Sequence, residues 1–332
     1  MSFFTIGYFR GNLGDDLMVN ILARKNFGKK FFLYSPNGLT LGNVKGCDNI
    51  GVVRNKFFDW FKCEGVVFIG GSLFQDYSNL AWRYYIKLYI FCCFSRLLGK
   101  DVFIFSSNLG PFNNKVTEYC VRGILKMARK TVVRDMSSFE YCTRYDISSV
   151  IDLDIVHKHY EIYSKEKARF LEPNKLLGVS VVGYEKWNTS TYIDNLVKHI
   201  VKLHDNFGFK VNLYSFCDDE DLELCKIVMN KVLSLKKIDI EIIRYESLEG
   251  SLSSISNCSY MICSRFHSVI LAIKNNIPFD MFIYSNKTID YLISHFDIKQ
   301  EGFSVSEEVK ENVHLLIGGE GFPDRQRENY EF

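Results

Sequence analysis

Short apolar runs alternate along the chain with longer segments in which apolar residues recur at helical spacing. In the first half, the apolar runs are residues 3–9, 30–35, 65–69, 101–106 and 131–133. The segments between them repeat apolar residues every three to four positions, as helices with one buried face do; they are residues 16–27, 80–98, 116–128 and 137–144. Strands and helices that alternate in this way form βαβ units around a mainly parallel sheet.

The alternation starts again after a charged stretch at residues 163–175, which we interpret as a linker. Apolar runs follow at residues 176–182, 209–215, 238–243, 260–263 and 278–283, with helical patterns at 192–207, 219–235 and 266–274. The sequence therefore predicts an α/β protein with two Rossmann-like domains, residues 1–165 and 176–300, and a cleft between them. Residues 301–332 are polar and Gly-rich at their end, and we expect a C-terminal segment with a flexible tail.

The length, charge and cysteine content of the chain limit the kinds of protein that it can be. A chain of 332 residues is long enough for two cores. The 41 basic and 39 acidic residues are interspersed and leave a formal charge of +2, so nothing indicates a nucleic-acid partner. Ten cysteines occur without a CxxC pair or a Cys/His group at zinc-ligand spacing, which favours a reduced, cytoplasmic protein with no metal.

The longest apolar stretch, residues 88–98, is too short to span a bilayer and contains Arg96. We expect a buried helix there. The alternative is a helix on a membrane surface, which would place the protein at the inner face of the membrane. The first residues lack the basic start and cleavage site of a signal peptide.

In parallel sheets, ligands bind beyond the carboxyl ends of the strands. The first predicted strand is followed by a turn that contains Asn12, Gly14, Asp15 and Asp16. Glycine permits a tight turn and close approach of a ligand, and the helix start offers N–H groups to an anion or a sugar. Asp15 or Asp16 is expected to cap the helix. The turn is neither GxGxxG nor a P-loop, which argues against a nicotinamide or P-loop nucleotide site.

Two further Gly/Ser loops follow predicted strands; they contain Gly71, Ser72, Gln75 and Asp76, and then Asn108 and Gly110. Another strand ends at Arg134. A buried arginine is costly unless it is paired. Arg134 is therefore expected either to pair with Asp135 or to bind a carboxylate or phosphate through its guanidinium fork.

The segment from Ser264 to His267 combines a cation with a base at the start of a predicted helix. We interpret Ser264 as the N-cap, which places His267 in the first turn, where the helix dipole favours the neutral imidazole. The alternative is a histidine with a purely structural role. The acidic run at residues 218–221 is interpreted as a solvated helix start rather than a metal site.

Taken in order, these motifs resemble the polysaccharide pyruvyl transferase family. The resemblance covers most of the chain, to Lys287, and rests on residues 11–16, 70–76, 109–111, 133–135 with Ser137, 152–154, 264–268, and the pair Tyr284 and Lys287. Two positions depart from the family pattern: Ile69 replaces the first of three glycines, and Asn286 replaces an acidic residue before the lysine.

The resemblance implies a fold similar to the glycosyltransferase-B architecture and a transferase that uses phosphoenolpyruvate as co-substrate, without a further cofactor. The product would be a cyclic pyruvate ketal on a sugar of a surface polysaccharide, such as a capsule or exopolysaccharide, or of its precursor, with release of phosphate. His267 would be the catalytic acid/base, and the donor would be held by Arg134, Ser264, Arg265, Phe266 and Lys287. We expect the three loops of the first domain to line the acceptor side of the cleft.

Other functions stay open at this point. A glycosyltransferase of the same architecture would use a nucleotide sugar, and a non-catalytic member would bind carbohydrate without turnover. The acceptor could be a free, nucleotide-linked, lipid-linked or polymeric sugar, and the oligomeric state is not predicted.

Overall fold

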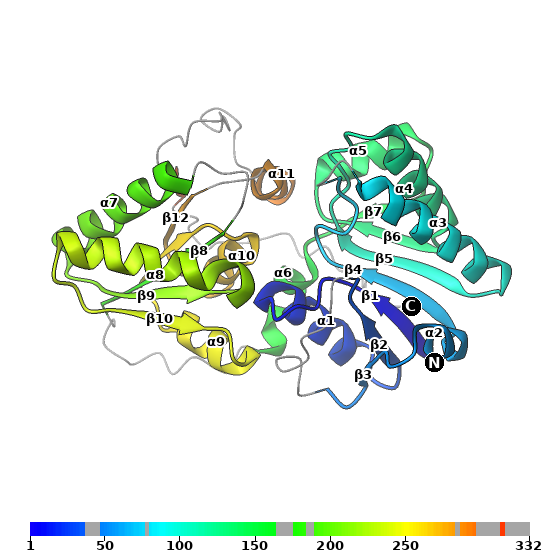
Figure 1. Ribbon diagram of the computed structural model, residues 1–332, viewed down its shortest axis with the longest axis horizontal. Helices are drawn as coiled ribbons and strands as arrows, with labels where there is room; N and C mark the ends of the chain where they lie inside the picture. Colours follow the sequence, from blue (N-terminus) through cyan, green and yellow to red (C-terminus); the bar gives the residue numbers. More distant parts are fainter. Residues whose placement is uncertain are drawn as a thin grey trace.

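The structure is a computed structural model that describes residues 1–36, 47–76, 80–163, 175–183, 189–282, 286–296 and 313–315. It contains two open sheets, each with helices on both faces (Figure 1). This arrangement confirms the predicted α/β class with two Rossmann-like domains. Among the described residues, no helix is long and apolar enough to cross a membrane.

The first sheet has the strand order β3-β2-β1-β4-β5-β6-β7, and its strands run parallel. In chain order the strands are β1 (Ser2–Ile6), β2 (Lys30–Tyr34), β3 (Ile50–Val52), β4 (Gly65–Ile69), β5 (Asp101–Ser107), β6 (Lys130–Val133) and β7 (Val150–Ile151). The helices are α1 (Leu13–Lys25), α2 (Lys56–Lys62), α3 (Ala81–Leu97), α4 (Lys115–Met127), α5 (Met136–Arg144) and α6 (Ile155–His159), followed by a short 3-10 helix, Tyr160–Ile162.

The second sheet has the order β10-β9-β8-β11-β12-β13. Its strands are β8 (Leu176–Val181), β9 (Lys210–Ser215), β10 (Ile240–Arg244), β11 (Tyr260–Cys263), β12 (Phe279–Met281) and β13 (Val313–Leu315). Its helices are α7 (Thr189–Phe207), α8 (Asp218–Leu235), α9 (Leu248–Ser256), α10 (Phe266–Lys274) and α11 (Asn286–His295). β13 pairs antiparallel with β12, so the C-terminal segment adds an edge strand to the second sheet. The expected flexible tail, the Gly-rich end of this segment, lies outside the described residues. Of the predicted linker at 163–175, residues 164–174 lie outside the described residues.

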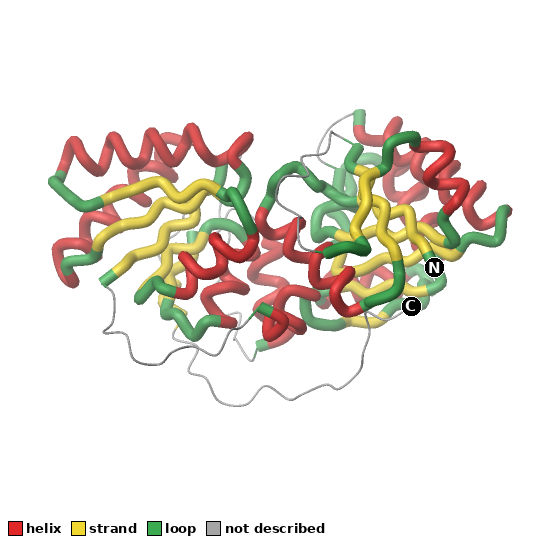
Figure 2. Tube along the Cα trace, turned by 90° about the horizontal axis from the view of Figure 1, so that it is seen from below, coloured by secondary structure: helices red, strands yellow, loops and turns green. Residues whose placement is uncertain are grey.

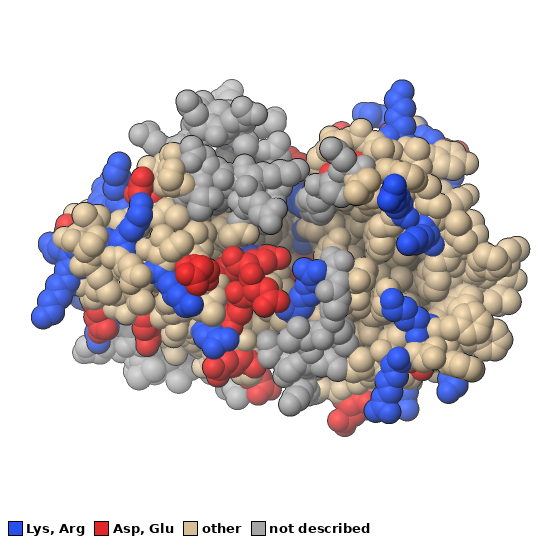
Figure 3. Space-filling model, in the orientation of Figure 1, with Lys and Arg blue, Asp and Glu red and all other residues tan. Residues whose placement is uncertain are grey.

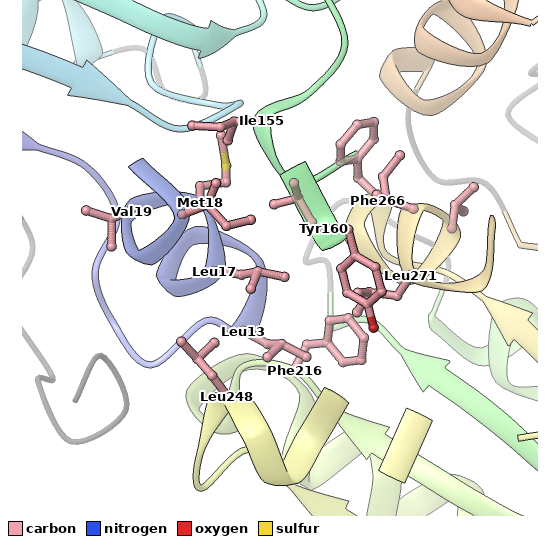
Figure 4. Packing of buried hydrophobic residues seen from close by; sticks show 14 of the residues in the cluster. Leu13, Leu17, Met18, Val19, Ile155, Tyr160, Phe216, Leu248, Phe266 and Leu271 are labelled. Carbon is pink, nitrogen blue, oxygen red and sulfur yellow. The ribbon is translucent and has the colours of Figure 1, made fainter. Parts of the chain in front are cut away.

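Both sheets are apolar on both faces, as buried parallel sheets are. In β4, for example, Val66 and Phe68 pack with α3 and α4, whereas Val67 and Ile69 face α1 and α6. Helices of both domains fill the space between the two sheets (Figure 2). One continuous hydrophobic core therefore joins the domains; Figure 4 shows Leu13 and Leu17 of α1 close to Phe216 and Leu248 of the second domain.

The N-cap residues of two helices, α1 and α10, differ from the predicted ones. α1 is capped by Asn12, whose side chain accepts a hydrogen bond from the Gly14 N–H, and neither Asp15 nor Asp16 caps it. α10 begins at Phe266 with Arg265 at the N-cap position, so Ser264 is not the cap. The Ser264 hydroxyl instead pairs with the Tyr192 hydroxyl at 2.9 Å. His267 still lies in the first turn, as predicted.

Candidate active site

Each sheet has one point where the strand order reverses, between β1 and β4 in the first and between β8 and β11 in the second. Ligands bind at such switch points, outside the carboxyl ends of the strands. Gly14 in the first turn of α1 and Gly71 in the turn after β4 lie at the first point, and the Arg265–His267 segment at the start of α10 lies at the second. The space-filling view is hollowed between the two domains (Figure 3).

Arg134 is the central cation of the site. Its side chain is 3% exposed, its Nε donates to Asn108 Oδ1 at 2.7 Å, and its Nη1 donates to Asp154 Oδ2 at 2.7 Å. The guanidinium carbon also lies 3.9 Å from the centre of the Phe266 ring, which belongs to the other domain. Arg134 is paired, but the expected partner is wrong: the ion pair is with Asp154, and Asp135 instead caps α5.

The glycine turn after β4 makes room for this guanidinium. A Cβ at Gly71 would lie 2.0 Å from Nη2 of Arg134, which no side chain could tolerate. Gly70 before it has φ 144°, a backbone conformation that favours glycine. The position of the Arg134 guanidinium therefore explains the glycine at residue 71, whether or not a ligand also binds there.

Asp154 links Arg134 to His267. Its carboxylate accepts hydrogen bonds from the Ser106 hydroxyl at 3.0 Å and from the Val156 N–H at 2.9 Å, so it caps α6. Oδ1 lies 3.6 Å from Nε2 of His267. Burial alone would raise the pKa of Asp154, but His267 and Arg134 outweigh it and hold that pKa well below the ordinary value. Asp154 is therefore a fixed negative charge between Arg134 and His267.

His267 enters the site from the second domain and packs against the first. A Cβ at Gly14 would lie 2.0 Å from its Nδ1, so the imidazole rests directly on the start of α1. Its Nε2 makes no hydrogen bond within the described residues. The ring meets Phe266 edge-on at 5.0 Å. A histidine held by packing, with one nitrogen beside a carboxylate, is well placed to exchange a proton.

Lys287 closes the site from α11. Its Nζ donates to Ser72 Oγ at 3.1 Å and to Gln75 Oε1, both in the loop after β4 of the first domain. Burial and the nearby Arg134 lower the pKa of Lys287 to about 7. The structure thus brings Ser72, Gln75 and Lys287 together, as the predicted cleft requires. Tyr284 lies outside the described residues.

Asp15 is a half-buried carboxyl in the first turn of α1. Its Oδ1 faces the Gly70 turn, 3.6 Å from where a Cβ would stand. Burial raises the pKa of Asp15 to about 6, although the charges of His267, Arg134 and Arg265 act in the opposite direction. An acid with such a pKa, close to both an arginine and a histidine, is typical of active sites.

Arg265 is bound by carboxylates of its own domain. Its Nε donates to Asp221 Oδ2 at 2.7 Å, and its Nη2 donates to Asp221 Oδ1 at 2.5 Å and to Glu220 Oε2 at 2.7 Å. The interpretation of residues 218–221 as a solvated helix start is therefore wrong for Asp221, which is fully buried. The role of Arg265 in donor binding stays a prediction.

The remaining loop residues divide into two groups. Asn108 is inside the site, where it orients Arg134. Asp16 is not: it is buried at the domain interface and accepts a hydrogen bond from the Tyr245 hydroxyl at 2.9 Å. Asp76 accepts from the Asn114 N–H at 2.9 Å and supports the start of α4, and Gly110 takes φ 73° in the loop after β5.

Sequence reasoning did not predict that Asp154 and Asp221 are the acidic partners of the two arginines, although residues 152–154 and 218–221 were singled out for other reasons. Asp154 follows the last strand of the first sheet, and a polar residue at a strand end was the signal that could have found it. Tyr291 was also missed; its hydroxyl is an acceptor for the Asp154 N–H at 3.2 Å and contacts His157 Nδ1 at 2.8 Å. Within the described ranges, no group of three His, Cys, Asp or Glu side chains could hold a metal ion.

Comparison with solved structures shows the fold class. The chain is similar to the UDP-GlcNAc 2-epimerase from Neisseria meningitidis bound to UDP-GlcNAc, with a TM-score of 0.57 and 10% identity, over 88% of this chain and 85% of that one. It is also similar to the Methanocaldococcus jannaschii UDP-GlcNAc 2-epimerase in complex with UDP-GlcNAc and UDP, with a TM-score of 0.53 and 12% identity, over 87% and 86%. These are glycosyltransferase-B-type folds, and at this identity they show the fold alone.

No curated protein sequence matches the chain. A family profile does: that of polysaccharide pyruvyl transferase matches residues 12–286, from the cap of α1 to the first residue of α11. The matched region contains Arg134, Asp154 and His267. The chain is a transferase of the polysaccharide pyruvyl transferase family.

Proposed function

We propose that the protein transfers the pyruvyl group of phosphoenolpyruvate to two hydroxyls of a sugar, with release of phosphate and formation of a cyclic ketal. The observation that carries this proposal is the meeting of Arg134 and His267, from different domains, on the single buried carboxylate Asp154. A site that combines a fixed cation with a positioned base suits an anionic donor and a hydroxyl acceptor.

The donor would lie between the Gly71 turn and the start of α10. Within the described residues, Nε of Arg134 donates to Asn108 and Nη1 donates to Asp154. The third nitrogen, Nη2, faces Gly71 and is the one best placed to bind a carboxylate or phosphate oxygen of the donor. Lys287 supplies a second cation from the other side. Helix starts add N–H groups to such a site.

The proposed reaction needs one group that donates a proton to the donor and one that removes a proton from the acceptor. Protonation of C3 of phosphoenolpyruvate leaves a cationic C2, which the first sugar hydroxyl attacks; the second hydroxyl then displaces phosphate. One hydroxyl proton replaces the proton given to C3, and the other leaves with the phosphate. We assign the removal of the hydroxyl proton to His267 and the protonation of C3 to Asp15, because the raised pKa of Asp15 keeps part of it protonated near neutral pH.

The acceptor is proposed to be a sugar of a surface polysaccharide or of its nucleotide- or lipid-linked precursor, modified in the cytoplasm. The similar epimerases bind UDP-GlcNAc in their structures, which supports a nucleotide-linked sugar as one acceptor to test. A glycosyltransferase, the alternative function, would also bind a nucleotide sugar. Binding of phosphoenolpyruvate as the donor must therefore be tested separately.

The test is thermal unfolding with phosphoenolpyruvate, together with phosphate release in the presence of candidate acceptors. A ligand at about a hundred times its Kd stabilises the native state by roughly 2.7 kcal/mol. We expect stabilisation that is lost in Asn108→Ala, which leaves the Arg134 fork unsupported, and kept in Asn55→Ala, which removes an exposed cap of α2 far from the site. Stabilisation by a nucleotide sugar alone, without phosphate release, would contradict pyruvyl transfer and favour glycosyl transfer. Binding of carbohydrate without either reaction would indicate a non-catalytic member.

A further inference from the structure

One exposed surface of the first domain is both apolar and basic. It consists of α2 and one face of α3. On α2, Phe57, Phe58 and Phe61 are exposed, Phe57 to 66%. α3 carries a stripe of exposed residues that recur at helical spacing. The first half of the stripe is cationic and the second half is apolar; its residues are Arg83, Lys87, Ile90, Phe94 and Leu97.

The two helices form one continuous surface. Trp60 of α2 packs on Phe91 of α3 at 5.4 Å between ring centres, and its Nε1 donates to Ser95 Oγ at 3.0 Å. Phe57 and Phe61 stack beside Trp60, with their own ring centres 6.4 Å apart. This packing anchors the exposed rings, which are therefore presented by a rigid element and not by a loop. We call these residues of α2 and α3 the aromatic–basic face.

The net charge of this face is positive. α2 and α3 carry five cations, Lys56, Lys62, Arg83, Lys87 and Arg96, and a single acid, Asp59. Asp59 is engaged by the Arg54 and Asn55 N–H groups at 2.7 and 2.9 Å. Of these five cations, Arg96 forms an ion pair with Asp101 at 2.7 Å, and the other four form none with any described residue. In Figure 3 the right-hand end of the molecule, where α2 and α3 lie in Figure 1, is mostly tan with blue side chains around it.

We propose that the aromatic–basic face docks the enzyme on a lipid bilayer with anionic headgroups. Large apolar side chains enter the headgroup boundary, and lysine and arginine bind the negative surface. A second copy of the chain fits less well, because a symmetric contact would bring the same cations together. α3 would lie along the membrane, and its first turn follows closely in sequence on Gln75 and Asp76 of the site, so a lipid-borne acceptor would reach the cleft from the docking plane.

The experiment is co-sedimentation of the full chain with vesicles of phosphatidylcholine, with and without phosphatidylglycerol. We expect binding to the anionic vesicles only, weakened by about 1 M salt. The double variant Phe94→Ser/Leu97→Ser and the double variant Arg83→Glu/Lys87→Glu should each weaken binding at least roughly tenfold. Because all four residues are exposed, the Tm should barely change.

Matched controls lie at the opposite end of the molecule. Phe207→Ser/Leu235→Ser removes two apolar side chains of similar exposure, and Lys198→Glu/Lys202→Glu reverses two cations at the same spacing on α7. Both should bind vesicles as the wild type does. Equal binding to neutral vesicles, equal loss in the controls, or a dimer that Phe94→Ser/Leu97→Ser dissociates would overturn the proposal. The test does not depend on the donor, so its outcome is independent of the proposed reaction.

Discussion

The imidazole of His267 rests on the backbone of Gly14, although the two residues belong to different domains. A Cβ at residue 14 would fall 2.0 Å from Nδ1 and 2.7 Å from Cγ of the histidine. The glycine is inside α1, where alanine would otherwise be the better helix former by about 1 kcal/mol. Its presence is therefore explained by the histidine above it.

Gly14→Ala should displace His267 and leave the donor cations in place. We expect turnover to fall about a hundredfold, which is typical of a displacement of about 1 Å, with a much smaller change in the KM for phosphoenolpyruvate. Gly250→Ala is the matched control, since this glycine is also in the first turn of a helix and its added Cβ would meet only the Ser247 hydroxyl. Unchanged turnover in Gly14→Ala would show that the position of His267 does not matter.

Arg134→Lys keeps the charge but removes the fork that binds Asn108 and Asp154 together. One ammonium cannot make both contacts and also stack on Phe266. We expect a loss of about 2–4 kcal/mol in unfolding free energy, because Asp154 loses its partner in a buried site, and loss of donor binding. Arg129→Lys, at an exposed ion pair with Asp101, should change neither quantity. A variant as stable as the wild type would contradict the role of the fork.

The proposed role of Asp15 predicts the direction of the pH dependence. Its pKa is raised to about 6, so the acid form needed to protonate C3 is lost as the pH rises through that value. We expect kcat/KM to fall about tenfold per pH unit on this limb. Asp15→Asn should lower kcat roughly 10²–10⁴-fold, whereas Asp76→Asn should leave the shape of the profile intact. An active Asp15→Asn enzyme with the same profile would exclude this assignment.

Asp16 offers a test of the domain interface. Burial raises its pKa to about 8, so between the ordinary value and about 8 the folded protein holds a proton that the unfolded chain has released. Folding stability from this group is therefore present at low pH and is lost as the pH rises toward 8. Asp16→Asn cannot ionise and can still accept from Tyr245. Its Tm relative to the wild type should increase steadily from about pH 5 to 8; a constant difference would contradict the shifted pKa.

The sequence by itself determined the alternation of strands and helices, and with it the two Rossmann-like domains. The periodicity of apolar residues carries this information locally, because a strand buried on both faces and a helix with one buried face have different repeats. Strand ends could also be located, and with them Arg134, Ser72, Gln75 and His267, since parallel strands place their carboxyl ends at one edge. The resemblance that identified the family rests on these same positions.

Only the tertiary structure decided which of these groups meet. Asp15 and Asp16 are adjacent in the sequence, yet Asp16 is buried against Tyr245 and Asp15 faces the site. The reason is that successive residues of a helix point in different directions. Asp154 became the partner of both Arg134 and His267, and Asp221 the partner of Arg265, through contacts between elements far apart in the chain. Such pairings depend on how helices and sheets pack, and no local pattern of residue types records them.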